Sequence, residues 1–499
     1  MGSVTDEEEI MTSNSQVISN LKPALVWRHF AALADRPRPS GYEQEVKTYV
    51  IAWAEDNGFK CYSDDIGNLI VKVPGRGVGV EAEPVILQGH LDMVCEKNSG
   101  VDHDFFKDPI QLRLEGDRLY AKQTTLGADN GIGVALSMAA GDGVYGDHPP
   151  LELLFTIDEE TGMSGALNLD GRYLAGRRLI NLDAEEEGVL YVGCAGGRDL
   201  VASRRLDWDA VEPGTLAVRL SLTGLRGGHS GLDIIKNRGN AIRLLSQILI
   251  QLPRKGVDLR LCRFEGGSKR NAIPREATAV VRIRAELLTR LPEILEAQMS
   301  ELKKLHTDSE ANFDLHIEAL QGDDIPPVKE IVAQGLLSYC FSQATGVVTM
   351  SQSIPGLVET SNNLGVVTWS EDLVTVTSCS RSSNGAALDQ LCDQLASVAH
   401  LCGLSVRSDA GYPGWLPDLS SPMLAITKEV FAEYYGREPE VTAIHAGLEC
   451  GILGERVPGL DMISFGPDIQ DAHSPDESVC PESVAVVHEQ LGHLLRALC

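Results

Sequence analysis

Apolar and polar residues alternate along this chain with two different periods. Between residues 26 and 57, apolar positions such as Phe30, Leu33 and Trp53 recur at helical spacing. Short apolar runs typical of buried strands follow, and an apolar helix is predicted over 131–140. The predicted strands are 68–73, 85–88, 151–156 and 179–182. Strands that alternate with helices in this way predict a mostly parallel α/β sheet.

The pattern changes near residue 207, where strands begin to alternate apolar and polar side chains. Half-buried strands are predicted at 216–222, 278–284, 313–319, 364–370 and 373–378, with helices at 240–251 and 291–305. This mixture is typical of a compact α+β domain. After about residue 398, apolar helices return, with a short strand at 462–465 and an amphipathic helix at 482–498.

Composition and charge narrow the class of protein. The 499 residues are 43% hydrophobic and 23% charged, which is ordinary globular usage. A net charge of −28 makes nucleic acid and anionic membrane surfaces unfavourable partners. Residues 1–20 lack the apolar core of a signal peptide, and we expect them to form an acidic, mobile extension. Eleven scattered cysteines without a CxxC pair indicate reduced thiols, so we expect a cytoplasmic protein.

Polar side chains follow several of the predicted strands. His90 and Asp92 come directly after the strand at 85–88, a spacing that lets a histidine bind metal while a carboxylate orients it. Asp129 lies between glycines at the start of the helix at 131–140, where it could equally be an N-cap. Glu159 and Glu160 follow the strand at 151–156, either as a solvated acidic turn or as a metal ligand beside a base.

Two more residues complete this pattern. Asp183 follows the strand at 179–182, and His473 follows the strand at 462–465, although a single histidine is often structural. Ligand sites in open α/β sheets lie beyond the carboxyl ends of strands. Nitrogen and oxygen donors without sulfur suit zinc or a similar ion. Five residues could hold two metals and leave Glu159 free as a base: His90, Asp129, Glu160, Asp183 and His473.

Ten segments of the chain resemble those of aminoacyl-histidine dipeptidases, also called Xaa-His dipeptidases or bacterial-type carnosinases. These enzymes belong to a clan of co-catalytic zinc metallopeptidases. The resemblance covers about residues 21–499, and HAGLECG and HSPDE are specific to this branch. The segments are GHLDMVCEKN, TTLGADNGIG, DEETGMSGA, NLDAEEEG, GGHSG, RNAIPRE, ETSNNLG, AGYPGW, HAGLECG and HSPDE.

The resemblance implies an architecture and a set of roles. It implies a catalytic metallopeptidase domain from 21–206 and 385–499, with a lid and dimerisation domain inserted at 207–384. It implies that the five residues above are metal ligands, with Asp129 bridging, and that Asp92 orients His90. Glu159 would be the general base, and the cofactors two divalent ions: zinc, or alternatively manganese or cobalt. It also implies a dipeptide substrate and a homodimer formed through the lid.

Further residues are candidates for contacts with the substrate. His229, in GGHSG, would stabilise the oxyanion, from its own chain or a partner's, but could be a turn histidine. Asn271, Arg275 and Arg381 would bind the substrate carboxylate, although surface salt bridges are a plain alternative for the arginines. His445 and Glu449 are four residues apart and would share one face of a helix. They would contact the amino end or imidazole of the peptide, or form a buried structural pair.

Three functions are consistent with these residues. The first is a metal-dependent dipeptidase acting on Xaa-His and other unblocked dipeptides. The second is a metal-dependent deacylase of N-acyl amino acids, with the same metals and base but a different pocket. The third is a scaffold protein without catalysis, which the intact set of ligands and Glu159 disfavours.

Overall fold

The computed structural model describes residues 14–306, 309–310, 312–321 and 325–499. The chain forms two compact units. One contains the chain up to Gly193 with Pro417–Ala443 and Leu448–Cys499, and the other contains Cys194–Leu416 with Ile444–Gly447. The second unit contains more of the chain than the insertion expected at 207–384, because β9 (Gly196–Arg205) and β19 (Ser405–Ser408) pair within its sheet. Its role as a lid stays a prediction.

Residues 1–13 of the expected N-terminal extension, 1–20, lie outside the described residues. From Asn14 onward the chain is anchored. The Asn14 amide donates hydrogen bonds to Asp35 and to the carbonyl of Ile110, and its oxygen accepts one from Leu112 N. Within the part of the chain that the structure describes, no helix has the length and apolar character of a membrane span.

The first unit is built on an eight-stranded sheet of order β1-β2-β6-β3-β7-β21-β8-β20. Its four central strands, β6, β3, β7 and β21, are parallel as predicted, and antiparallel strands flank them. The strands are β1 (Lys60–Ser63), β2 (Leu69–Val73), β3 (Val85–His90), β6 (Leu151–Thr156), β7 (Arg178–Asn181), β8 (Val189–Cys194), β20 (Glu440–Ile444) and β21 (Asp461–Ser464).

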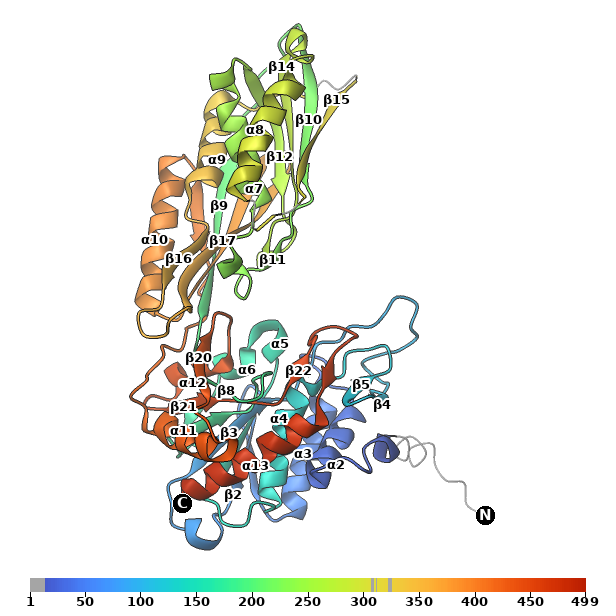
Figure 1. Ribbon diagram of the computed structural model, residues 1–499, viewed down its shortest axis with the longest axis vertical. Helices are drawn as coiled ribbons and strands as arrows, with labels where there is room; N and C mark the ends of the chain where they lie inside the picture. Colours follow the sequence, from blue (N-terminus) through green and yellow to red (C-terminus); the bar gives the residue numbers. More distant parts are fainter. Residues whose placement is uncertain (1–13, 307–308, 311, 322–324) are drawn as a thin grey trace. The chain divides into compact units, whose positions relative to one another are not determined.

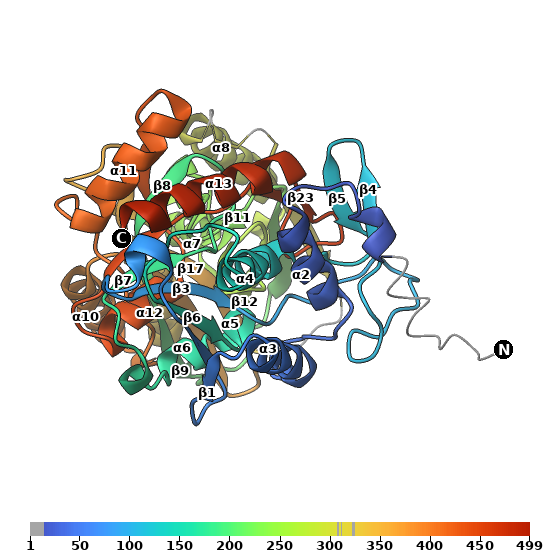
Figure 2. The ribbon, with the colours of Figure 1, turned by 90° about the horizontal axis from the view of Figure 1, so that it is seen from below.

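The central strands are parallel because helical crossovers cover them. Every residue of β3 and β6 is buried, and the polar side chains among them, such as Gln88 and Glu152, make hydrogen bonds. Helix α4 packs on β3 and β6, and α2 packs on α4, while α11 packs on β21 and α13 (Figures 1 and 2). The longer helices are α2 (Ala24–Ala34), α3 (Gln44–Asp56), α4 (Ala128–Gly141), α11 (Pro422–Tyr435), α12 (Glu449–Arg456) and α13 (Pro481–Ala497).

The second unit is a nine-stranded sheet, antiparallel in every pair described, with helices α7 to α10. The side chains of Val218, Leu220 and Leu222 alternate inward from β10 and join its apolar core. The other strands of this sheet are β10 (Thr215–Thr223), β12 (Leu259–Gly266), β14 (Ala277–Arg284), β15 (Asp314–Leu320), β16 (Gly346–Met350), β17 (Val358–Trp369) and β18 (Leu373–Ser382), and the helices are α7 (Ala241–Gln251), α8 (Leu291–Leu305), α9 (Glu330–Ser342) and α10 (Gly385–Leu401).

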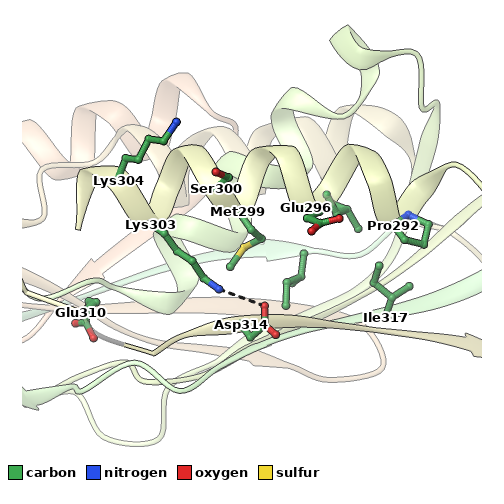
Figure 3. A pocket seen from close by; sticks show the side chains of 11 residues that line it. Pro292, Glu296, Met299, Ser300, Lys303, Lys304, Glu310, Asp314 and Ile317 are labelled. Atoms are coloured by element: carbon green, nitrogen blue, oxygen red, sulfur yellow. Dashed lines mark ion pairs between the residues drawn. The ribbon is translucent and has the colours of Figure 1, made fainter. Parts of the chain in front are cut away.

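A groove of 840 Å³ lies between α8 and β15 in the second unit (Figure 3). Apolar side chains such as Met299 and Ile317 line it, and Lys303 spans it toward Asp314 with 3.7 Å between Nζ and Oδ1. The residues that line this groove include none of the predicted site residues. The groove therefore takes no part in the chemistry considered below.

Candidate active site

The predicted metal ligands of the first unit lie at one edge of its central sheet. His90 ends β3, and the pairing of β3 with β6 places it opposite Thr156, the last residue of β6. Glu159 and Glu160 follow in α5 (Glu159–Gly162), and Asp183 follows β7, the other neighbour of β3. Parallel strands present their carboxyl ends at the same edge, which is why segments distant in sequence meet here.

Ligand atoms of these residues form overlapping groups, each within 4.8 Å. The groups are His90, Asp129 and Asp183; Asp129, Glu160 and His473; and His90, Glu159 and Glu160. Asp129 belongs to two of them: its Oδ1 lies 2.9 Å from His90 Nε2, and its Oδ2 lies 3.2 Å from His473 Nε2. A second contact of 3.1 Å joins His473 Nε2 to Glu160 Oε2. Asp129 is therefore the residue that both histidines share.

The donor set fits divalent metal ions. Glu160 Oε1 is buried and has no hydrogen-bond partner among the described residues. Asp183 Oδ1 is also buried without a hydrogen bond in that part of the chain, although His90 Nε2 lies 3.4 Å from it. Buried carboxylate oxygens without partners are costly, and a bound cation would satisfy them. Imidazole nitrogens and carboxylate oxygens without thiolate are ligands that zinc accepts readily.

The electrostatics of these side chains also favour a bound cation. Burial raises the pKa of Glu159 well above its ordinary value, and the nearby charges of Asp183 and Glu160 add to this effect. Burial likewise raises the pKa of Asp183 to about 6. Hydrogen bonds with Asp129 and Glu160 raise the pKa of His473 to about 11. The site thus carries an excess of negative charge, which favours cations.

Asp92 holds two of these segments together. Its Oδ1 accepts a hydrogen bond from Glu159 N at 3.0 Å, and its Oδ2 accepts one from Glu160 N at 3.1 Å. The same Oδ1 lies 3.4 Å from His90 Nδ1. Burial alone would raise the pKa of Asp92, but the hydrogen bond and charge of His90 lower it to about 2. Asp92 therefore stays ionised between the His90 ring and the turn of Glu159.

Asp129 is not the N-cap of α4, the alternative that its position in the sequence left open. The cap position is Gly127, whose φ of 70° is in the left-handed region that glycine adopts freely. Asp129 has non-helical backbone angles of φ −77° and ψ 112°, and its carboxylate faces the two histidines instead.

Most of the predicted substrate contacts lie in the second unit. Arg381 is 7% exposed and donates hydrogen bonds to Ser230 Oγ at 3.4 Å and to Tyr412 Oη at 3.0 Å. Among the residues that the structure describes, no carboxylate lies within ion-pair distance of its guanidinium. The imidazole of His445 contacts Ser361 Oγ at 2.7 Å. Burial and the charge of Arg381 lower the pKa of His445 to about 4, which keeps the ring neutral.

His229 and Asn271 are brought together by a short β-ladder. Strand β11 (Gly228–His229) pairs with β13 (Ala272–Ile273), and Ser230 N donates to the carbonyl of Asn271 at 2.8 Å. Since Ser230 also contacts Arg381, this ladder places His229 and Asn271 near the guanidinium. Arg275 differs, because its Nε donates to the carbonyl of Leu225 at 3.1 Å.

The expectation that His445 and Glu449 share a helix face is wrong. Helix α12 begins only at Glu449, and Leu448 before it is extended, with φ −139° and ψ 150°. His445 belongs to the second unit and Glu449 to the first. Glu449 is fully buried, where its Oε2 accepts hydrogen bonds from Gln88 Nε2 and Thr156 Oγ1, both at 2.6 Å. The helical spacing was misleading because the chain leaves one unit and enters the other between these residues.

Comparison with known proteins identifies a family whose sequences match this chain. The model of peptidase family M20/M25/M40 matches residues 86–497. The chain belongs to this family. It is 39% identical over 483 residues, 96% of the chain and 99% of the relative, to the cytosol non-specific dipeptidase of Escherichia coli K12.

Two solved structures are similar to this chain to different degrees. The aminoacylhistidine dipeptidase of Vibrio alginolyticus is 41% identical, with a TM-score of 0.88 over 96% of this chain and 98% of that one. Aminopeptidase PepT of Bacillus cereus is 14% identical, with a TM-score of 0.56 over 96% and 99% of the two chains. The PepT match shows a shared fold alone.

The structure also brings forward residues of this M20 peptidase that spacing in the sequence did not single out. Tyr412 and Ser361 contact Arg381 and His445, and Glu477 binds the loop that carries Asp129. These three lie within the segments AGYPGW, ETSNNLG and HSPDE. The resemblance of those segments was the available signal, because no local periodicity marks side chains whose partners are far away in sequence.

Replacing Asp129 with asparagine should remove most metal binding. One oxygen of the shared carboxylate would become an amide nitrogen, which is not a metal ligand. Both ligand groups that contain Asp129 would therefore bind metal less tightly. We expect zinc affinity to fall by more than about 100-fold, beyond the loss typical of residues that only support ligands. Titration of metal-free protein with zinc against a chromophoric chelator measures this.

Asp158→Asn is the matched control for this experiment. Asp158 lies in the same acidic run, but its carboxylate bonds to Thr161 and Ser164 and belongs to none of the three groups. We expect it to bind zinc as the unaltered protein does. Unchanged zinc affinity in Asp129→Asn would show that these groups are not the metal site.

Proposed function

We propose that this chain is a metal-dependent dipeptidase that hydrolyses unblocked dipeptides, Xaa-His dipeptides among them. The observation that carries the proposal is the pair of ligand groups sharing Asp129, with the half-buried Glu159 beside them. Membership of a peptidase family supports it, as do the names of two relatives, a non-specific dipeptidase and an aminoacylhistidine dipeptidase. The name of the first relative also supports a cytosolic setting.

The residues proposed to hold the metal ions divide around Asp129. His90 and Asp183 would bind one ion, Glu160 and His473 the other, and Asp129 both. We propose zinc, with manganese or cobalt as alternatives, since the donors are nitrogen and oxygen alone. Such ions lower the pKa of water toward about 7 and polarise a carbonyl oxygen.

Glu159 is proposed as the general base. A carboxylate whose pKa is raised toward the working pH both accepts and releases a proton efficiently. Burial and neighbouring carboxylates raise the pKa of Glu159 in this way. Its carboxylate would take a proton from the attacking water and deliver it to the amine that leaves when the peptide bond breaks. Asp92 holds the backbone of Glu159 and would keep its carboxylate in place.

Arg381 is proposed to bind the free carboxylate of the dipeptide. The guanidinium is buried and held by neutral groups, Ser230 and Tyr412, so an anionic ligand would supply the charge that it lacks. Asn271, whose carbonyl accepts a hydrogen bond from Ser230 N, is proposed to add an amide donor. His229 is proposed to stabilise the oxyanion, from the same chain or from a partner in the homodimer that the family resemblance implies.

A panel of substrates tests the proposed activity. We expect metal-free protein to be inactive and added zinc or manganese to restore hydrolysis of carnosine, Gly-His and Ala-Ala, but not of an N-acetyl amino acid. Cleavage of the acetylated compound alone would show a deacylase instead. No hydrolysis by protein that has bound metal would support the scaffold.

Glu159→Gln should abolish turnover and keep the metals. Glutamine has nearly the same shape but cannot accept the proton, so we expect kcat to fall by about 10²- to 10⁴-fold. Zinc content, measured by elemental analysis, should stay unchanged, which separates lost chemistry from lost metal. Hydrolysis at the rate of the unaltered enzyme would show that another residue is the base.

Arg381→Met should weaken binding of substrates with a free carboxylate. Losing a charged hydrogen bond costs about 1.5–3 kcal/mol, so we expect KM for Ala-Ala to rise by about 10- to 150-fold with little change in kcat. Ala-Ala amide should be nearly unaffected by the substitution. Arg275→Met is the matched control, because its guanidinium already bonds to the Leu225 carbonyl. A larger effect of Arg275→Met would reverse the assignment.

A further inference from the structure

Glu477 makes an unusual set of hydrogen bonds in the first unit. Glu477 is 2% exposed, and its carboxylate accepts hydrogen bonds from four backbone N–H groups. Leu126 N and Gly127 N donate to Oε2 at 2.7 and 2.9 Å, and Ala128 N and Asp129 N donate to Oε1 at 2.7 and 3.3 Å. One side chain therefore binds every amide of the segment that leads into Asp129.

These four amides have no other side-chain cap. Ala128 N and Asp129 N belong to the first turn of α4, where N–H groups lack helical partners, and Leu126 N and Gly127 N lie just before it. The cap residue Gly127 has no side chain to offer. A capping residue normally lies next to its helix in sequence. Here the cap comes from a segment near the other end of the chain, so it joins two distant loops as well as ending a helix.

The second loop carries His473. Glu477 follows it by four residues, and its N–H donates to the carbonyl of Ser474 at 3.0 Å, which closes the turn. Strand β22 (Ile469–Gln470) before this turn pairs with β23 (Ser478–Val479) after it, and β23 pairs in turn with β5 (Arg118–Ala121). The base of the turn is thus fixed, and Glu477 connects it to the loop of Asp129.

Arg38 binds the same loop from its carbonyl side. The guanidinium is 3% exposed and donates to the carbonyls of Leu91 and Asp92 at 3.0 and 2.9 Å, and also to the carbonyl of Gly127. A Cβ on Gly127 would lie 2.4 Å from Arg38 Nη2, so this position has no room for a larger residue. Arg38 therefore connects the loop of His90 to the loop of Asp129, as Glu477 connects the loop of His473 to it.

We propose that Glu477 is a positioning residue for metal binding, which fixes the shared carboxylate of Asp129 relative to His473. The inference rests on the proposed function, because it takes Asp129 and His473 as ligands. Glu477 belongs to none of the ligand groups and acts only through the backbone that it binds. Supporting groups of this kind typically contribute 10- to 100-fold to metal affinity.

The substitution Glu477→Gln tests this role. Glutamine keeps one acceptor oxygen but places an NH₂ group against two of the four N–H donors, so half of the connection is lost. We expect the zinc affinity of metal-free protein, measured by competition with a chromophoric chelator, to fall by about 10- to 100-fold. The visible absorption of bound Co²⁺ should also change, because the geometry around the ion would relax.

Glu152→Gln is the matched control. Glu152 is also a buried glutamate of the first unit: it accepts hydrogen bonds from Ala175 N and Gly176 N, and pairs with Lys72. It lies near the start of β6, whereas the site lies beyond the end of that strand. We expect this variant to lose thermal stability to a similar degree and yet to bind zinc and Co²⁺ as the unaltered protein does.

The outcomes separate the two proposals. If the unaltered chain binds no zinc, the proposed function fails. If it binds zinc and Glu477→Gln matches it in affinity and Co²⁺ spectrum, only the positioning role is overturned. Equal weakening in Glu152→Gln would also overturn that role, since the effect would then be one of general stability. If Glu477→Gln does not fold, the same zinc affinity and Co²⁺ spectrum are measured for Glu477→Asp, which keeps the charge but has a shorter side chain. The same outcomes then support or overturn the positioning role.

Discussion

The structure of the first unit depends on one electrostatic constraint, the burial of several carboxylates around two histidines. Asp129, Glu159, Glu160 and Asp183 lie so close together that their charges repel, and burial removes the water that would screen them. Such a group is stable only if cations or protons offset it. The surrounding strands, helices and loops form a frame that holds the carboxylates together despite their repulsion and their loss of hydration.

That frame is built from backbone hydrogen bonds. Parallel strands bring His90, Glu159 and Asp183 to one edge of the sheet, but strand ends alone do not fix the direction of a side chain. Asp92 binds the amides of Glu159 and Glu160, and Glu477 binds those that lead into Asp129. Negatively charged residues thus position other negatively charged residues through the N–H groups between them.

The strongly apolar parts of the fold could be predicted from the sequence. The expected strands 85–88 and 151–156 correspond to β3 and β6, and the expected helix 291–305 corresponds to α8. Strand β12 was not predicted, because a bulge between Leu261 and Arg263 breaks its alternation of apolar and polar positions. Strand β9 was not predicted, because it begins with two glycines and contains the buried Asp199. Residues that follow predicted strands were also found, and the structure brings His90, Asp129, Glu160, Asp183 and His473 together. Partners such as Glu477 and Tyr412 follow from the tertiary fold, which has no local pattern in sequence.

The segment around His445 shows how the two units share one chain. Residues 444–447 leave the first unit, join the second, and return to the first at Leu448. Within the second unit, Ala195 N donates to the carbonyls of Ile444 and Ala446, and His445 contacts Ser361. During synthesis, therefore, the second unit lacks part of its native structure when Leu416 has been made and must wait for these four residues. The second unit has all its residues once Gly447 has been made, whereas the first unit still needs Leu448–Cys499.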